Sequence, residues 1–324
     1  MKFSCEKNLL VSAISVASRT VAMKSAIPAL EGIYIRAGVK VMLSGYNLET
    51  GITVSVDAEI RETGEAIFPS RLFFDIVRKL PDDTVEVSVD ENFKVSIRGG
   101  ISSFSITAMS AEDYPELPDV ESEKGVVLPQ KQLKEMISGT IFAVSENQAR
   151  PIHTGCLFEV ADDGITVIAV DGYRLALRRW TPEGGVGRQM KFVAPAAALK
   201  EVEKILTDSD DDCTFYLGTK HILFTIGEAT LVCRILEGEF LDWRRVLPEN
   251  NPIKLAANVS AITDSIERVS LVISEKLKSP VRCTFGDQTA DFRTISTIGT
   301  AHDVCQIAGD GKDLEIGFNC RYLL

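Results

Sequence analysis

The sequence repeats one order of segments three times, with a period of about 125 residues. Each copy begins with a short extended segment. An amphipathic helix follows, whose apolar residues recur at helical spacing and form one core-facing side. The matching residues are Leu10, Ala13, Ile14, Ala17 and Val21 in the first copy, Leu133, Met136, Ile137, Thr140 and Val144 in the second, and Val259, Ile262, Ile266, Val269 and Ile273 in the third. A repeat of this length predicts three similar folded units.

The first helix of each copy precedes short runs of Val, Ile, Thr and Phe, which are broken by Gly, Asp and Asn and predict antiparallel hairpins. A second helix is predicted at 70–79, 195–206 and 318–324, with Ser70 as an N-cap and Pro195 in a first turn. The expected fold is therefore α+β, with three repeated units of antiparallel sheet carrying two helices each. We expect the units at 1–121, 122–249 and 250–324.

The third copy is the shortest. Three copies of about 125 residues would need about 375, so the 324-residue chain is short by about 50. Asn319 is a predicted N-cap with a single helical turn after it, which is too short to be stable alone. The third unit is therefore expected to be incomplete just inside its second helix, with unpaired sheet edges.

Composition excludes several classes of protein. The chain contains no run of about 18 apolar residues, which a membrane-spanning helix would need, and its first residues lack a signal-peptide pattern, so we expect a cytoplasmic protein. The seven Cys are scattered without a C-x-x-C pair, and only three His are present. We therefore expect no metal site and no cofactor.

The distribution of charge is uneven. The net charge of −11 argues at first against a nucleic-acid partner, but binding depends on where the charge lies. The six predicted helices (7–24, 70–79, 129–146, 195–206, 258–276 and 318–324) together carry +5, which leaves −16 for the remainder. The helices are thus the part of the chain most compatible with a polyanion.

A catalytic function is not favoured by the residues. His153 and Cys156 are close in sequence, and Asp171 could orient a histidine. However, three residues apart in a predicted strand, His153 and Cys156 would point to opposite faces. Gly311 and Lys312 lack the rest of a phosphate-binding loop. We therefore predict that the protein is not an enzyme.

Several tracts resemble one family along the whole chain. They are "FPSRLFFDIVRKLP" (68–81), "RGGISSFSITAMSAEDYPELP" (98–118), "VDGYRLALRRW" (170–180), "LEGEFLDWRRVLPEN" (236–250) and "LEIGFN" (314–319). In order and spacing they are similar to the bacterial sliding clamp, the beta subunit of DNA polymerase III. The resemblance implies a homodimeric ring around double-stranded DNA, with helices lining the hole. It also implies binding to the polymerase III catalytic subunit, the clamp loader and other proteins with a clamp-binding motif.

The resemblance assigns roles to particular residues. It implies DNA contact at Lys24, Gln148 and Arg150, although Pro151 and Ile152 replace a tyrosine pair found in some clamps. It implies that the partner-peptide pocket between the second and third domains is formed by His153, Gly172, Tyr173, Arg174, Leu175, Leu241, Val246, Asn319 and Tyr322. It implies a dimer interface formed by Leu72, Phe104 and Ile106 on one side and Leu271 and Val272 on the other.

Three alternatives stay open at this point. From the residues alone, "VDGYRLALRRW" also fits a plain hairpin whose Leu175 and Ala176 face a core. The whole chain also fits a non-DNA hydrolase or binding protein built on a repeated α+β unit, or a degenerate relative of the clamps.

Overall fold

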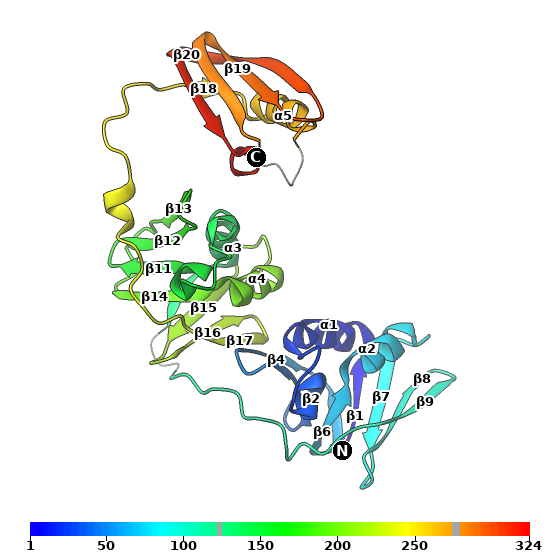
Figure 1. The fold of residues 1–324 in the computed structure, drawn as a ribbon. Coiled ribbons are helices and arrows are strands. Elements are labelled where there is room, and N and C mark those ends of the chain that lie inside the picture. The colour runs from blue at the N-terminus through cyan, green and yellow to red at the C-terminus, as the bar shows by residue number, and fades with distance from the viewer. Residues whose placement is uncertain (122–124, 274–278) are drawn as a thin grey trace. The chain divides into compact units, whose positions relative to one another are not determined.

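The computed structural model describes residues 1–121, 125–273 and 279–324, and it divides into two compact units. Unit 1 comprises Met1–Phe240 and unit 2 comprises Leu241–Leu324 (Figure 1). Among the described residues, no helix is both long and apolar enough to cross a membrane.

Unit 1 carries two copies of the predicted helix pair. The α-helices of its described part are α1 (Lys7–Ala17), α2 (Ser70–Lys79), α3 (Gln130–Ser138) and α4 (Ala196–Ile205). Its 3-10 helices are η1 (Ser18–Thr20), η2 (Pro28–Glu31), η3 (Ile141–Ala143) and η4 (Pro151–Thr154). The predicted core-facing residues of α1 and α3 are buried, and Val21 and Val144 pack partly buried against the same core.

The first helices are shorter than the periodicity predicted. The α-helix expected at 7–24 ends at Ala17, and the one expected at 129–146 ends at Ser138. The hydroxyls of Ser18 and Thr140 donate to the carbonyls of Ile14 and Met136 one turn back, at 2.5 and 2.7 Å. These hydrogen bonds from side chain to backbone compete with the backbone hydrogen bonds of the helix, so each α-helix ends near this point.

The predicted N-cap at Ser70 and the predicted first-turn position of Pro195 were also wrong. Pro69 and Pro195 occupy the N-cap positions of α2 and α4, because each preceding strand runs directly into its helix. Ser70 is therefore the first residue inside α2, and its hydroxyl donates to the Ser18 hydroxyl at 3.0 Å. This contact joins the two helices of the first copy.

The strands in the described part of unit 1 form three antiparallel sheets. The first sheet has the order β5 (Glu59–Glu62), β1 (Lys2–Glu6), β7 (Thr84–Val89), β8 (Lys94–Gly99) and β9 (Ser102–Thr107). The second has the order β10 (Val126–Pro129), β15 (Asp212–Leu217), β16 (His221–Ile226), β17 (Ala229–Arg234), β4 (Thr50–Val56), β3 (Val41–Tyr46), β2 (Gly32–Ala37) and β6 (Gly64–Pro69). The third has the order β13 (Leu175–Trp180), β12 (Gly164–Val170), β11 (Gly155–Ala161) and β14 (Met190–Pro195).

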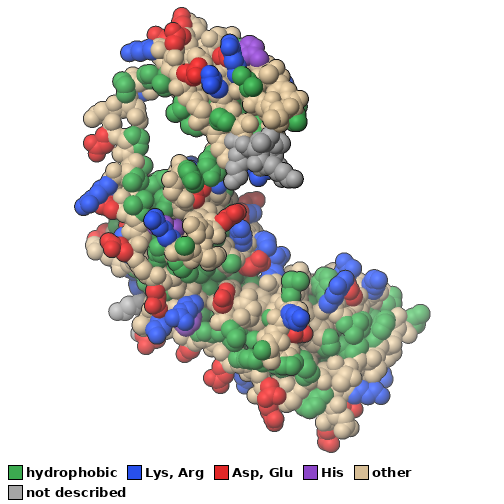
Figure 2. Space-filling view, viewed as in Figure 1, with side chains coloured by type: hydrophobic (Ala, Val, Ile, Leu, Met, Phe, Trp, Pro, Cys, Tyr) green, Lys and Arg blue, Asp and Glu red, His purple; other side chains and the backbone are tan. Residues whose placement is uncertain are grey.

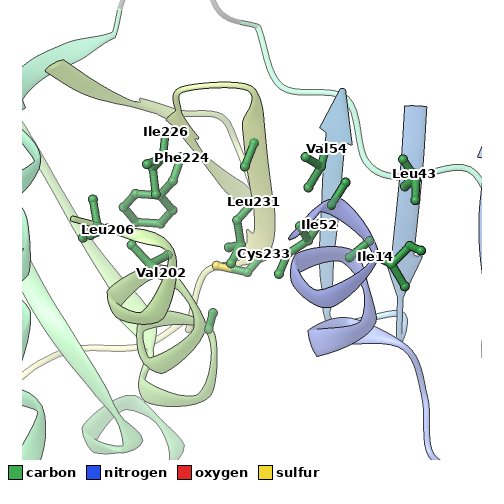
Figure 3. Packing of buried hydrophobic residues seen from close by; sticks show 14 of the residues in the cluster. Ile14, Leu43, Ile52, Val54, Val202, Leu206, Phe224, Ile226, Leu231 and Cys233 are labelled. Atoms are coloured by element: carbon green, nitrogen blue, oxygen red, sulfur yellow. The ribbon is translucent and has the colours of Figure 1, made fainter. Parts of the chain in front are cut away.

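The eight-stranded sheet crosses from the first copy into the second. Its central pair is β17 with β4, in which Leu231 lies opposite Ile52. Directly opposed residues share one face of a sheet, so these two side chains point into the same core. Figure 3 shows them between the helix that carries Ile14 and the helix that carries Val202. One buried cluster therefore continues across the junction between the two copies.

Unit 2 has a separate core under one helix. Its sheet has the order β18 (Ala256–Ala257), β20 (Thr300–Phe318) and β19 (Val281–Ile295), and its helices are η5 (Trp243–Val246), α5 (Val259–Ser270) and α6 (Cys320–Leu323). Ile266, Val269 and Phe292 lie in its core. Asn319 caps α6 as predicted, and its side chain accepts from the Arg321 amide at 3.1 Å.

The third copy departs from prediction at its first helix. The helix expected at 258–276 ends at Ser270, and residues 274–278 lie outside the described residues. Val259 was expected on the core face, but its side chain is 78% exposed because it begins the helix beside the two-residue strand β18. Ile266 and Val269 are the buried residues that pack α5 against the core of unit 2.

The predicted class is confirmed: the chain is α+β, with antiparallel sheets and few helices. Unit 1 holds two copies of the repeat joined by one sheet, and unit 2 holds the third. The sequence-based bounds of 1–121, 122–249 and 250–324 stay a prediction, since the structure separates units only after Phe240.

The junction core gives a stability prediction. Ile52 is fully buried, so Ile52→Ala leaves a cavity and should lower the free energy of unfolding of unit 1 by about 2–5 kcal/mol. The control Ser55→Ala changes a half-buried side chain on the same strand and should stay within about 0.5 kcal/mol. Urea unfolding followed by circular dichroism measures both. Equal, small effects would show that the junction does not depend on this core.

Candidate functional site

The four helices of unit 1 are more basic than the chain as a whole. Helices α1 to α4 carry eight Lys and Arg side chains against four Asp and Glu, whereas the whole chain has 35 against 46. Figure 2 shows Lys and Arg side chains along the edge of unit 1 where α2 lies. The exposed Arg71, Arg78 and Lys79 belong to α2. A polyanion would meet the least acidic part of the chain here.

The three predicted DNA-contact residues lie in two equivalent loops. Lys24 lies in the exposed segment between η1 and η2, while Gln148 and Arg150 lie in the segment between η3 and η4. All three side chains are exposed. The second loop is ordered by Asn147, whose side-chain oxygen accepts from the Ala149 amide at 2.9 Å. The repeat thus places both loops at the same point of the fold, after the first helix of each copy.

The turn before β13 is built around Asp171. Its Oδ1 accepts from the amides of Tyr173 and Arg174 at 2.9 and 3.0 Å, and Gly172 adopts φ +95°. This left-handed conformation favours glycine, because a residue without a Cβ adopts it at no steric cost. The turn leaves the Tyr173 side chain 84% exposed and places half-buried Leu175 at the start of β13.

Arg174 is held in one orientation by two groups. Its Nε donates to Asp171 Oδ2 at 3.0 Å, and Nη2 donates to the Phe142 carbonyl. The guanidinium lies 5.4 Å from the centre of the Phe142 ring. Charge-assisted hydrogen bonds and stacking restrict this side chain, so it presents a fixed edge to a ligand. Asp171 therefore orients Arg174 and not a histidine.

His153 lies in η4 and not in the predicted strand. Its ring meets Phe240 edge-on, with centroids 5.2 Å apart, and its buried Nε2 has no hydrogen-bond partner among the described residues. Burial, with a smaller effect of the nearby Arg150 charge, lowers the pKa of His153. The imidazole is therefore neutral at neutral pH, which suits its contact with the Phe240 ring.

The remaining predicted pocket residues belong to unit 2. The side chains of Leu241 and Val246 are 42% and 49% exposed, and Val246 lies in η5. Asn319 and Tyr322 lie at α6, with Tyr322 39% exposed. The structure thus brings Gly172, Tyr173, Arg174 and Leu175 together in one turn and Asn319 and Tyr322 together at one helix. The pocket as a whole stays a prediction.

Two surfaces carry the predicted dimer residues. Phe104 and Ile106 lie on β9, an edge strand of the first sheet, and Leu72 lies on α2. The side chains of Leu72 and Phe104 are 48% and 41% exposed, while Ile106 packs partly against the core. In unit 2, Leu271 is 80% exposed and Val272 is half-buried. Large exposed apolar side chains beside a free strand edge are typical of an interface.

The cysteine considered as a nucleophile is unsuited to that role. Cys156 is fully buried on β11, and burial raises the pKa of its thiol to about 12. The thiolate, which is the reactive form, is therefore scarce at neutral pH.

Sequence reasoning missed two residues that shape the site. Asp171 was read only as a potential partner of a histidine, although an Asp-Gly pair followed by two residues is a recognisable turn signal. Phe142 in η3 is 55% exposed and contacts Arg174 through its carbonyl and its ring. No signal in the sequence indicates this contact, because it joins segments 32 residues apart.

The fold of this chain matches that of known DNA clamps. The sequence models of the N-terminal, central and C-terminal domains of the DNA polymerase III beta subunit match residues 1–118, 127–242 and 244–324. The chain therefore belongs to the DNA polymerase III beta subunit family.

Individual relatives are similar to this protein along the whole chain. The chain is 31% identical to the beta sliding clamp of Staphylococcus epidermidis over 340 aligned positions, which cover all of this chain and 89% of that protein. The DNA polymerase sliding clamp of Bacillus subtilis superposes with a TM-score of 0.93 at 28% identity, covering 100% of this chain and 88% of that one. A griselimycin-bound sliding clamp from Pseudomonas aeruginosa gives a TM-score of 0.93 at 26% identity, with the same coverage.

Proposed function

We propose that this protein is a DNA polymerase processivity factor: a homodimeric ring that encircles duplex DNA, slides on it and tethers the replicative polymerase. The observation that carries the proposal is the agreement of all three repeated units, in order, with the three domains of the sliding-clamp family. The basic helices of unit 1 supply the surface that would face the phosphates.

The modest positive charge of helices α1 to α4 suits a protein that slides on DNA. Each Lys or Arg contact to a phosphate releases counterions and strengthens binding, and many such contacts would hold the protein in place. A closed ring is retained by its topology, so weak contacts are enough. Lys24, Gln148 and Arg150 extend from two equivalent loops and are proposed to touch the DNA.

Partner proteins would dock through the predicted pocket. The fixed edge of Arg174, the exposed Tyr173 ring and the aliphatic Leu175 offer donors beside an apolar surface. Leu241, Val246, Asn319 and Tyr322 would supply the other wall. A short peptide with a Leu or Phe anchor fits such chemistry, and the polymerase III catalytic subunit, the clamp loader and other clamp-binding proteins would each carry one.

The ring would close through edge strands and apolar side chains. Phe104 and Ile106 on β9 and Leu72 on α2 would meet Leu271 and Val272 of a second copy. No catalytic step is proposed, because tethering needs none. The protein would work in the cytoplasm, where bacterial chromosomal DNA lies.

Topological retention tests the proposal. Labelled protein loaded on nicked circular DNA by a clamp loader and ATP should stay bound through gel filtration in high salt. Cutting the circle should release it, because the ring slides off a free end. Equal retention on circular and linear DNA, or none on either, would contradict the clamp and favour the non-DNA alternative.

The pocket makes a separate prediction. Leu175→Ser with Val246→Ser removes two apolar contacts of about 1–2 kcal/mol each, so the affinity for a fluorescent peptide with a Leu-Phe anchor should fall about 100-fold. The matched control, Val39→Ser with Val127→Ser, changes two exposed valines elsewhere. Fluorescence polarisation measures both. An unchanged affinity of the first variant would place the peptide in another groove.

A further inference from the structure

Unit 1 contains a second copy of the turn that bounds the predicted peptide pocket. In the first repeat, Asn47 Oδ1 accepts from the amides of Glu49 and Thr50 at 3.0 and 2.8 Å. Asp171 makes the same pair of bonds in the second repeat. The second position of each turn has positive φ, +73° at Leu48 and +95° at Gly172. The two turns are therefore equivalent in geometry as well as in sequence position.

Leu48 holds that conformation at a cost in free energy. A left-handed backbone is strained for a residue with a side chain, and glycine would avoid the strain. The Leu48 side chain is nevertheless 54% exposed, so burial in the core does not explain the choice of leucine. A strained, exposed aliphatic side chain at a loop tip is suited to contact with another molecule.

A hollow of about 580 Å³ lies beside this turn, across the junction of the two repeats. Glu49 and Thr50 line it from the first repeat, and Ile235 and Leu236 line it just beyond β17. Ala196 and Ala197 at the start of α4 also line it, and so does Gln148, one of the three proposed DNA contacts. In the 125-residue repeat, Ala197 is the counterpart of Tyr322, which belongs to the predicted pocket. We call this hollow the junction groove.

The rim of the junction groove carries more acidic than basic side chains. Glu49, Glu146 and Glu237 line it, together with Lys200 and Arg234. Arg234 is already paired with Glu237, 3.3 Å away. Of the other three charged residues, Glu49 and Glu146 are acidic, Lys200 is basic, and all three are exposed. The rim therefore keeps a net negative charge, which favours a positively charged ligand over a phosphate backbone.

We propose that the junction groove is a second docking site, which binds an extended peptide with an aliphatic anchor flanked by Lys or Arg. The aliphatic side chains would rest on Ile235 and Leu236, and the basic flanks would pair with Glu49 and Glu146. The inference rests on the proposed function only for the class of ligand, a peptide. The groove itself lies entirely within unit 1.

The probe is a fluorescein-labelled peptide, Gly-Lys-Leu-Ile-Lys-Gly, measured by fluorescence polarisation against the full chain. Its counterpart Gly-Glu-Leu-Ile-Glu-Gly reverses the charges. Glu49→Lys with Glu146→Lys should weaken binding of the basic peptide at least tenfold and improve binding of the acidic one. Both substitutions are on exposed side chains, so the fold should not be disturbed. The control Glu91→Lys, at the β7–β8 turn, should change neither.

A second variant tests the groove through its shape. Ala197 is exposed at the start of α4, so Ala197→Trp should fill the hollow and also reduce peptide binding at least tenfold. Leu175→Ser with Val246→Ser should leave this binding unchanged, which separates the groove from the predicted pocket. Failure of the basic peptide to bind, or equal binding by all variants, overturns the proposal even if circular DNA is retained normally. Loss of DNA retention in Ala197→Trp with normal peptide binding would assign the groove to DNA and also overturn it.

Discussion

The pairing of β17 with β4 is the interaction on which the rest of unit 1 depends. These strands are about 180 residues apart in sequence, yet they form the centre of an eight-stranded sheet. Ile52 and Leu231 lie opposite each other and share one core with α1 and α4 (Figure 3). Because the pairing fixes one repeat against the next, it sets the relation of their helices and of the loops that carry Lys24, Gln148 and Arg150.

The same pairing explains why the functional surfaces lie where they do. Helices packed on one continuous sheet gather their exposed Lys and Arg side chains, while the acidic side chains concentrate elsewhere in the chain. The junction groove lies at the paired strands, and the turn at Asp171 lies at the edge of the next sheet. A single structural repeat thus generates both the basic helices and the two equivalent turns on which the proposals rest.

The sequence predicted the repeat, the α+β class and the buried faces of α1 and α3, because helical spacing of apolar residues is a local signal. Helix ends were predicted less well, since back-bonding by Ser18 and Thr140 depends on side-chain orientation. The β17–β4 pairing and the contact of Phe142 with Arg174 join distant segments, so no local pattern indicates them. The roles of Lys24, Gln148 and Arg150 came from family resemblance and stay predictions.

The central claim is that two copies close into a ring, and the mass in solution tests it most directly. Size-exclusion chromatography with light scattering should give a dimer, twice the 35.5 kDa of one chain. Phe104→Asp places a charge on the exposed edge strand β9 and should shift the mass to that of a monomer, because an unpaired charge in an apolar interface is unfavourable. A monomer mass for the unsubstituted chain at every concentration, or a dimer that Phe104→Asp leaves intact, would contradict the account.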